Sequence, residues 1–143
     1  MTYAPPPTSD ILTESDGFPR PSWTLFFNSL YEGDSGTEWE PTFQNLGTTG
    51  APTISGRFYR LGGLNLIFFR ITIIPATNTT STAGTTYCDN FPVSIREDGV
   101  CMSVSGNLGG ALGHVVAVNN RIYTPAWSTI TDPVTIIGMA EAR

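Results

Sequence analysis

Few side chains in this chain are suited to chemistry, and none of them forms a recognised catalytic pattern. Paired carboxylates for glycoside hydrolysis would have to come from Glu38 with Glu40 or from Glu97 with Asp98. Neither pair has the apolar sequence neighbours that keep a catalytic carboxylic acid protonated. The sequence also lacks a Gly-x-Ser-x-Gly nucleophile motif. We therefore assign no catalytic residue and predict that the protein is not an enzyme.

The single histidine, His114, lies in an apolar strand-like run, LGHVVAV. It has no cluster of acidic or cysteine residues near it in the sequence. We interpret it as a hydrogen-bonded, partly buried residue that shares a strand face with Leu112, Val116 and Val118, rather than as a catalytic or ligand residue. One histidine and two cysteines do not make the usual zinc ligand set, and the acidic residues lack the spacing of a calcium loop. The sequence thus predicts no metal site and no cofactor.

The two cysteines, Cys88 and Cys101, are expected to be reduced thiols rather than a disulfide. The first residues, MTYAPPPTSD, have neither the positive nor the apolar region of a secretory signal. No run of about 18 apolar residues marks a transmembrane span. We accordingly expect no membrane insertion and no export by such a signal.

Charge is sparse and unevenly distributed along the 143 residues. Residues 1–40 hold seven acidic residues and one arginine, a net −6, whereas the remainder holds six arginines and five acidic residues, a net +1. Charged residues make up 13% of the chain against a usual share of about 25%, and lysine is absent. Since no basic patch is available to bind phosphates, nucleic-acid binding is not expected.

Residues 1–31 differ from the rest and are predicted to form an extended arm followed by one short anchoring helix. Five prolines among the first 21 residues favour extended backbone. Ser22 can cap a helix whose apolar residues recur at the i, i+3, i+4, i+7 spacing of one face. This stripe either closes one end of the body or contacts another subunit or a larger particle. Its members are Trp23, Phe26, Phe27 and Leu30.

Residues 32–143 read as short strands separated by glycine, proline and asparagine. About eight strands at this spacing indicate an all-β fold, an antiparallel β-sandwich of the jelly-roll type. The longest connection, residues 76–86, is rich in hydroxyl side chains and is predicted to be a surface loop. The expected strands lie at about residues 38–45, 52–61, 64–75, 87–95, 99–105, 112–118, 121–127 and 133–142.

The run LNLIFFRITII, residues 64–74, is apolar on both faces of an extended strand. A thin antiparallel sheet normally exposes one face to water, so a strand of this kind needs a second cover. Either it is sandwiched inside one subunit or it lies at a subunit interface. The residues assigned to this core or oligomer interface are Leu66, Ile67, Phe68, Phe69, Ile71 and Ile73.

Three stretches of the body carry a resemblance to a known group of proteins. GAPTISGRFYRLGG, LNLIFFRITIIPATNTTSTAGTTYCDNFP and NNRIYTPAWSTITDPVTIIG resemble a domain of small structural proteins of tailed bacteriophages, including tail-fibre and appendage proteins. The resemblance covers approximately residues 39–143. The leading SWTLFFNSLY is similar, less specifically, to the leaders that attach such proteins to the virion. The resemblance implies an all-β domain displayed on a phage particle, commonly as a trimer and without chemistry of its own.

These observations together predict a virion structural protein, a short trimeric tail fibre or appendage attached by residues 1–31 and assembled in the cytoplasm of the bacterial host. Its expected partners are copies of itself, other virion proteins and a glycan of the host surface. Two alternatives stay open: a capsid or neck decoration (cement) protein without a receptor role, and a free carbohydrate-binding module or enzyme. The loop residues expected to contact a receptor are Thr77, Asn78, Thr79, Thr80 and Asn107.

Overall fold

The computed structural model describes residues 36–61, 65–105, 108–129 and 131–143. The chain divides into two units, residues 1–35 and 36–143, and the following description concerns the second. The predicted arm and its four-residue apolar stripe lie outside the described residues.

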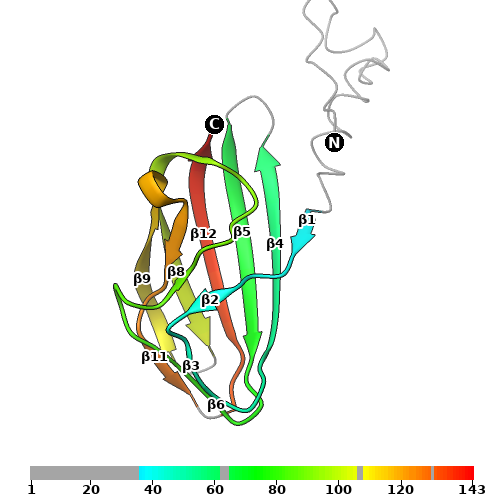
Figure 1. Cartoon of the computed structure of the whole chain (residues 1–143), viewed down its shortest axis with the longest axis vertical. Helices are drawn as coiled ribbons and strands as arrows, with labels where there is room; N and C mark the ends of the chain where they lie inside the picture. Colours follow the sequence, from blue (N-terminus) through cyan, green and yellow to red (C-terminus); the bar gives the residue numbers. More distant parts are fainter. Residues whose placement is uncertain (1–35, 62–64, 106–107, 130) are drawn as a thin grey trace, which may run out of the picture. The chain divides into compact units, whose positions relative to one another are not determined.

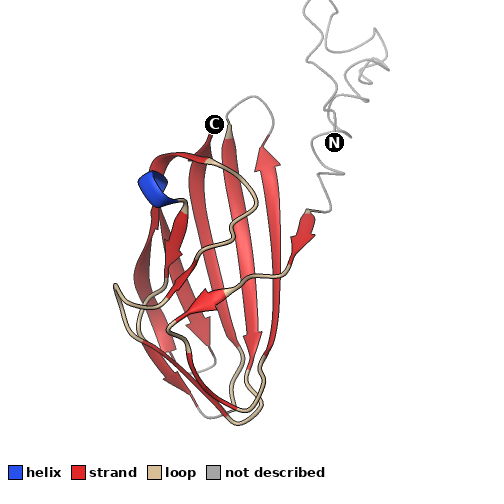
Figure 2. Cartoon of the chain, in the orientation of Figure 1, coloured by secondary structure: helices blue, strands red, loops and turns tan. Residues whose placement is uncertain are grey.

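The described part of the chain is built almost entirely of strands, with one short 3₁₀ helix (Figures 1 and 2). The elements are β1 (Thr37–Trp39), β2 (Phe43–Gln44), β3 (Gly47–Thr49), β4 (Thr53–Leu61), β5 (Leu66–Ile74), β6 (Asn78–Ser81), β7 (Tyr87–Cys88), β8 (Ile95–Ser105), β9 (Leu108–Val116), η1 (Ala117–Asn119), β10 (Arg121–Tyr123), β11 (Trp127–Thr129) and β12 (Val134–Ala142).

The strands form two antiparallel sheets. The large sheet has the order β1-β4-β5-β12-β8-β9-β10-β7-β2, and the small one has the order β11-β6-β3. The last strand in the sequence, β12, therefore lies between β5 and β8, in the middle of the large sheet (Figure 1). Residues of β7, β10 and β11 belong to the same buried cluster as those of β5 and β12, so the sheets enclose one core. The all-β, sandwich-like prediction is confirmed, while the jelly-roll connectivity stays a prediction.

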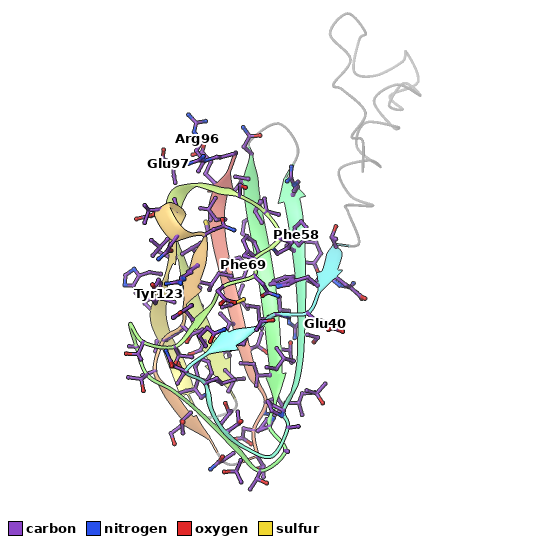
Figure 3. The ribbon with its side chains drawn as sticks, in the orientation of Figure 1. Glu40, Phe58, Phe69, Arg96, Glu97 and Tyr123 are labelled. Atoms are coloured by element: carbon purple, nitrogen blue, oxygen red, sulfur yellow. The ribbon has the colours of Figure 1, made fainter. Side chains whose placement is uncertain are left out.

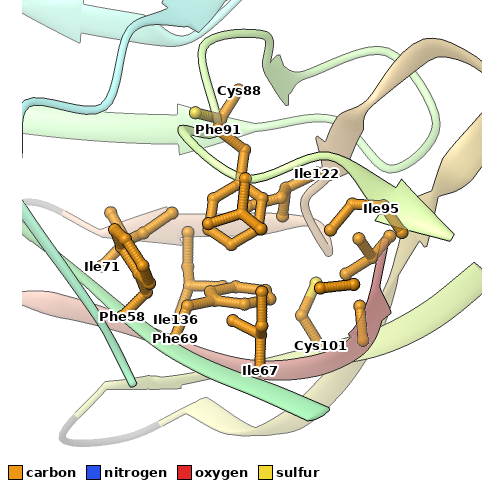
Figure 4. Packing of buried hydrophobic residues seen from close by; sticks show 14 of the residues in the cluster. Phe58, Ile67, Phe69, Ile71, Cys88, Phe91, Ile95, Cys101, Ile122 and Ile136 are labelled. Atoms are coloured by element: carbon orange, nitrogen blue, oxygen red, sulfur yellow. The ribbon is translucent and has the colours of Figure 1, made fainter. Parts of the chain in front are cut away.

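The inner face of β5 forms the centre of this core. Ile67, Phe69, Ile71 and Ile73 are each at most 1% exposed, as period-2 alternation requires of a strand whose one face is buried. Phe91, from the segment after β7, contacts Phe69 with a ring-centroid separation of 5.4 Å (Figure 4). Of the six residues assigned to a core or an oligomer interface, these four lie in the core of the domain.

The prediction of a surface loop over residues 76–86 is wrong for its middle. This segment contains β6, and the side chains of Thr79, Ser81 and Thr86 are buried. Their hydroxyl groups are satisfied internally: Ser81 Oγ donates to the Pro125 carbonyl oxygen at 2.7 Å, and Thr86 Oγ1 donates to the Asn45 carbonyl oxygen at 2.9 Å. Hydroxyl-rich strands can be buried when each hydroxyl group has a partner.

Two further predictions are corrected. The strand expected at residues 87–95 is only the two-residue β7, and Pro92, which cannot donate a ladder hydrogen bond, lies in the irregular part that follows. His114 is exposed rather than partly buried. Its neighbour Val115 is fully buried, and this fixes the alternation of β9 so that His114 points outward.

Candidate functional site

The most unusual surface of the domain is the outer face of the large sheet, where β5, β12, β8 and β9 expose apolar side chains. The strand registers place these side chains side by side. Met139 lies opposite Phe68 on one neighbouring strand and opposite Val100 on the other. Met102 lies opposite both Ile137 and Leu112. We call this surface the outer apolar face; it comprises Phe68, Val100, Met102, Val104, Leu112, Ile137 and Met139.

The outer apolar face is open to water in the isolated chain. Six of its members are between 39% (Met139) and 66% (Leu112) exposed, and Phe68 is half-buried. Part of it is a shallow hollow of about 140 Å³ with an entirely apolar lining. Given about 200 Å² for a fully exposed large side chain, the exposed apolar area is on the order of 500 Å². This approaches the upper end of what a monomeric protein usually exposes, about 600 Å².

Few polar groups interrupt this surface. Arg70 lies opposite Ile137 at its β5 side, and His114 lies opposite Val100 at its β9 side. An apolar centre with polar groups only at its border is typical of a protein interface. The arrangement is suited to excluding water against another apolar surface and offers no group that would perform a reaction.

A second surface feature lies along β1 and β4, on the flank of β5 that is away from β12. It is an open hollow of about 580 Å³, which we call the edge cleft. Arg57 of β4 lies opposite Arg70 of β5, and Arg57 also forms an ion pair with Glu38 of β1. The residues of the edge cleft used below are Glu38, Trp39, Glu40, Ser55, Arg57, Tyr59, Arg70 and Thr72.

The two acidic pairs considered as glycosidase residues lie apart from each other, and only Glu38 and Glu40 share a hollow, the edge cleft. Glu40 and Glu97 lie in separate parts of the domain (Figure 3). Glu38 is exposed and paired with Arg57, and the Asp98 carboxylate accepts a hydrogen bond from the Ala117 backbone N–H at 2.8 Å. The carboxylates of Glu38 and Asp98 therefore have structural partners.

The predicted receptor-contact residues are not all on the surface. Thr77 and Thr80 are exposed, Asn78 is half-buried, and Asn107 lies outside the described residues. Thr79 is fully buried, and its Oγ1 accepts a hydrogen bond from Trp127 Nε1 at 3.4 Å, so the assignment of Thr79 to a contact loop is wrong. Alternation along β6 turns this side chain inward, between its exposed neighbour Thr80 and the half-buried Asn78.

Both cysteines are free and buried. Burial raises the pKa of the Cys88 thiol to about 11, although hydrogen bonding with Asn90 and Thr42 opposes the shift. Burial likewise raises the pKa of the Cys101 thiol to about 12. Thiols of this kind are protonated near neutral pH and are therefore weak nucleophiles and weak metal ligands.

Sequence reasoning found Phe68, the β5 member of the outer apolar face, and missed the other six members. The available signal was the same as for β5: the runs VCMSV at residues 100–104 and VTIIGM at residues 134–139 are also apolar on both faces of a strand. What their sequences do not give is that β12 lies next to β5 and that β8 lies next to β12.

No cluster of three or more His, Cys, Asp or Glu side chains suited to a metal occurs within the described residues. Within the same residues, no helix has the length and apolar character needed to cross a membrane. Comparison with protein-family models, with curated proteins and with solved structures found no match.

Proposed function

We propose that this chain is a structural subunit of a tailed-bacteriophage virion, a short trimeric tail fibre or appendage attached to the particle through residues 1–31. The observation that carries the proposal is the outer apolar face, which a solitary subunit leaves exposed to water. A structural subunit buries such a face against its neighbours, and no catalytic step is part of this function.

The size of the outer apolar face favours assembly. Two such faces packed together would remove on the order of 1,000 Å² of apolar surface from water, close to the lower end of a standard protein interface. At about 25 cal/mol per Å² this contributes about 25 kcal/mol before costs. Association costs about 4–15 kcal/mol in lost translational and rotational freedom, and side-chain ordering and desolvation of polar groups add to this, so the area supports assembly without setting its affinity.

The virion assignment is supported by the resemblance of residues 39–143 to phage appendage domains and by the acidic, proline-rich leader. A trimer is proposed because the resemblance implies it. Three copies related by a threefold axis would bring their outer apolar faces together in closed symmetry, which leaves no apolar face unpaired.

A decoration protein of the head or neck is the second candidate. The same outer apolar face would then lie against the shell rather than against copies of the chain. Locating the protein on particles by electron microscopy distinguishes the two, because a fibre projects from the tail whereas a decoration protein lies on the shell.

The proposal is tested by the mass of the full-length protein in solution at micromolar concentration. We expect three times the chain mass of 15.4 kDa. Leu112→Glu places a charge in the face and should yield a folded monomer. Val118→Glu is the matched control, because Val118 is 92% exposed and lies in η1, outside the face. A monomeric wild-type protein, or equal loss of assembly in both variants, would contradict the proposal.

A further inference from the structure

The edge cleft exists because β1 is shorter than the strand it pairs with. β1 pairs only with Gly56–Phe58 of β4 and ends at Trp39, whereas β4 extends back to Thr53. The edge of β4 near Ser55 is thus left uncovered, and the hollow forms there. Its volume of about 580 Å³ lies in the range of small-molecule sites, about 300–1,000 Å³.

The charged groups that line the edge cleft balance. Arg57 and Arg70 contribute two guanidinium groups, and Glu38 and Glu40 contribute two carboxylates. An anion would be attracted by the arginines and repelled by the glutamates, so the lining does not favour a charged ligand of either sign. It favours a neutral ligand with many hydrogen-bonding groups.

The edge cleft offers both kinds of hydrogen-bonding partner. Guanidinium groups only donate and carboxylates only accept, while the hydroxyl groups of Ser55, Tyr59 and Thr72 do both. A sugar hydroxyl group also donates and accepts at once, and therefore matches such a mixed lining. An apolar ligand would leave these groups without partners, at a cost of about 1–3 kcal/mol for each group that becomes buried.

Aromatic side chains complete the match. Tyr59 and Trp39 line the edge cleft, and both are half-buried. Tyr59 comes from the outward-facing set of β4, to which Arg57 belongs. The Trp39 ring packs against the core rings of Phe58 and Phe91, at centroid separations of 6.0 and 5.4 Å, and its Nε1–H is buried, so Tyr59 is the aromatic side chain that a ligand in the cleft can reach. Aromatic rings combine apolar contact area with a polar group, as the apolar faces and hydroxyl groups of a pyranose ring require.

From this geometry we propose that the edge cleft is a binding site for a neutral saccharide. The inference deepens the host-surface contact within the proposed function and moves it from the loop at residues 76–86 to β1, β4 and β5. The site borders the outer apolar face at Arg70, which lies opposite Ile137, and at Tyr59, which lies opposite Phe68. The apolar members of that face do not line the cleft, so assembly and sugar binding use different residues.

The test is a calorimetric titration of the full-length protein. The probes are neutral tetrasaccharides of glucose, galactose, mannose and N-acetylglucosamine, with a glucuronate-containing tetrasaccharide and inorganic phosphate as charged comparisons. We expect at least one neutral tetrasaccharide to bind in the micromolar to millimolar range, and the charged probes to bind at least tenfold more weakly. Failure of every neutral probe at millimolar concentration, or preference for a charged probe, would overturn the proposal.

Variants locate the site. Arg70→Ala and Tyr59→Ala should each weaken saccharide binding at least tenfold. Arg143→Ala is the matched arginine control and Thr80→Ala tests the loop, and neither should change binding. If Thr80→Ala abolishes binding while the two cleft variants do not, the saccharide binds elsewhere and the inference is wrong.

Solution mass and the unfolding transition of each variant separate this inference from the proposed assembly. If the folded Arg70→Ala and Tyr59→Ala variants keep the wild-type mass and bind the saccharide as tightly as the wild type does, the cleft is rejected and the assembly stands. A monomer that binds sugar through Arg70 and Tyr59 rejects the assembly and supports the cleft.

Discussion

Gly138 in β12 lies directly opposite Phe69 in β5, and the Phe69 ring occupies the space that a side chain at position 138 would need. On the other side of Gly138, the Cβ of Cys101 would lie 2.8 Å from an added methyl group. Both neighbours are buried and neither can move away easily. The glycine therefore allows the largest fully buried side chain of the core to pack against the central strand.

Gly138→Ala is expected to destabilise the fold by about 2–3 kcal/mol, because overpacking a filled core forces side chains and backbone to shift. Urea unfolding of the variant measures this. Phe69→Leu should restore part of the loss in the Gly138→Ala background although it destabilises the wild type, since it frees space for the added methyl group. Additive losses in the double variant would contradict the packing argument.

The two buried thiols should make stability fall at high pH. Each folded-state pKa, about 11 for Cys88 and about 12 for Cys101, lies above the ordinary thiol pKa of 9.0. The thiol proton is therefore bound more tightly in the folded protein, so this stability is complete below pH 9 and is lost as the pH rises through 11 to 12. Between these limits each thiol contributes a slope of about 1.4 kcal/mol per pH unit.

Denaturant unfolding of wild type and of the Cys88→Ala, Cys101→Ala double variant, measured from pH 8 to pH 11, checks this expectation. The double variant should show a flatter loss of stability above pH 9. Equal slopes in the two proteins would mean that other groups cause the loss.

Asn90 should be worth more to stability than its exposed position suggests. Its Nδ2 donates to the Glu40 carbonyl oxygen at 2.7 Å, and its Oδ1 accepts from the Thr42 backbone N–H at 2.8 Å. These bonds hold the chain between β1 and β2 against the segment after β7. Asn90→Ala is expected to cost about 2 kcal/mol, since each such bond contributes about 1 kcal/mol.

Thermal and urea unfolding measure the Asn90 effect. The matched control is Asn119→Ala, which removes a single exposed hydrogen bond to Tyr123 Oη at 3.2 Å and should cost less than about 0.5 kcal/mol. Equal effects of the two variants would show that Asn90 does not fasten the two segments.

Arg57 and Arg70 lie directly opposite each other on the neighbouring strands β4 and β5, and the ion pair between Glu38 and Arg57 offsets their repulsion. Like charges in this position are destabilising, and exposed ion pairs contribute at most about 1 kcal/mol. Glu38→Gln should therefore lower stability by up to about 1 kcal/mol at 20 mM salt and by much less at 1 M salt, because salt screens exposed charges. Glu97→Gln serves as the control, and its change in stability relative to wild type should not depend on salt. If the stability change of Glu38→Gln is the same at both salt concentrations, the electrostatic explanation is contradicted.

Local pattern was enough to predict much of the fold. Alternation placed Ile67, Phe69, Ile71 and Ile73 on one face of a strand, and the turn residues divided the body into short strands. It also led to the prediction that LNLIFFRITII needs a cover on both faces; within the domain only the inner face is covered, and the cover of the outer face stays a prediction. These conclusions depend only on the period of two residues between side chains on the same face of a strand, which any sequence displays directly.

Only the tertiary structure decided which strands are neighbours. The placement of β12 between β5 and β8 joins Phe68, Met139 and Val100 into one surface, and the short β1 leaves the cleft beside Arg57 open. The packing of the domain also buries Thr79, although the hydroxyl-rich sequence around it had predicted an exposed loop. Pairing between strands that are distant in the sequence depends on the packing of the whole domain. The burial of a hydroxyl group depends on whether that packing supplies a hydrogen-bond partner. The local sequence pattern therefore predicts neither of them.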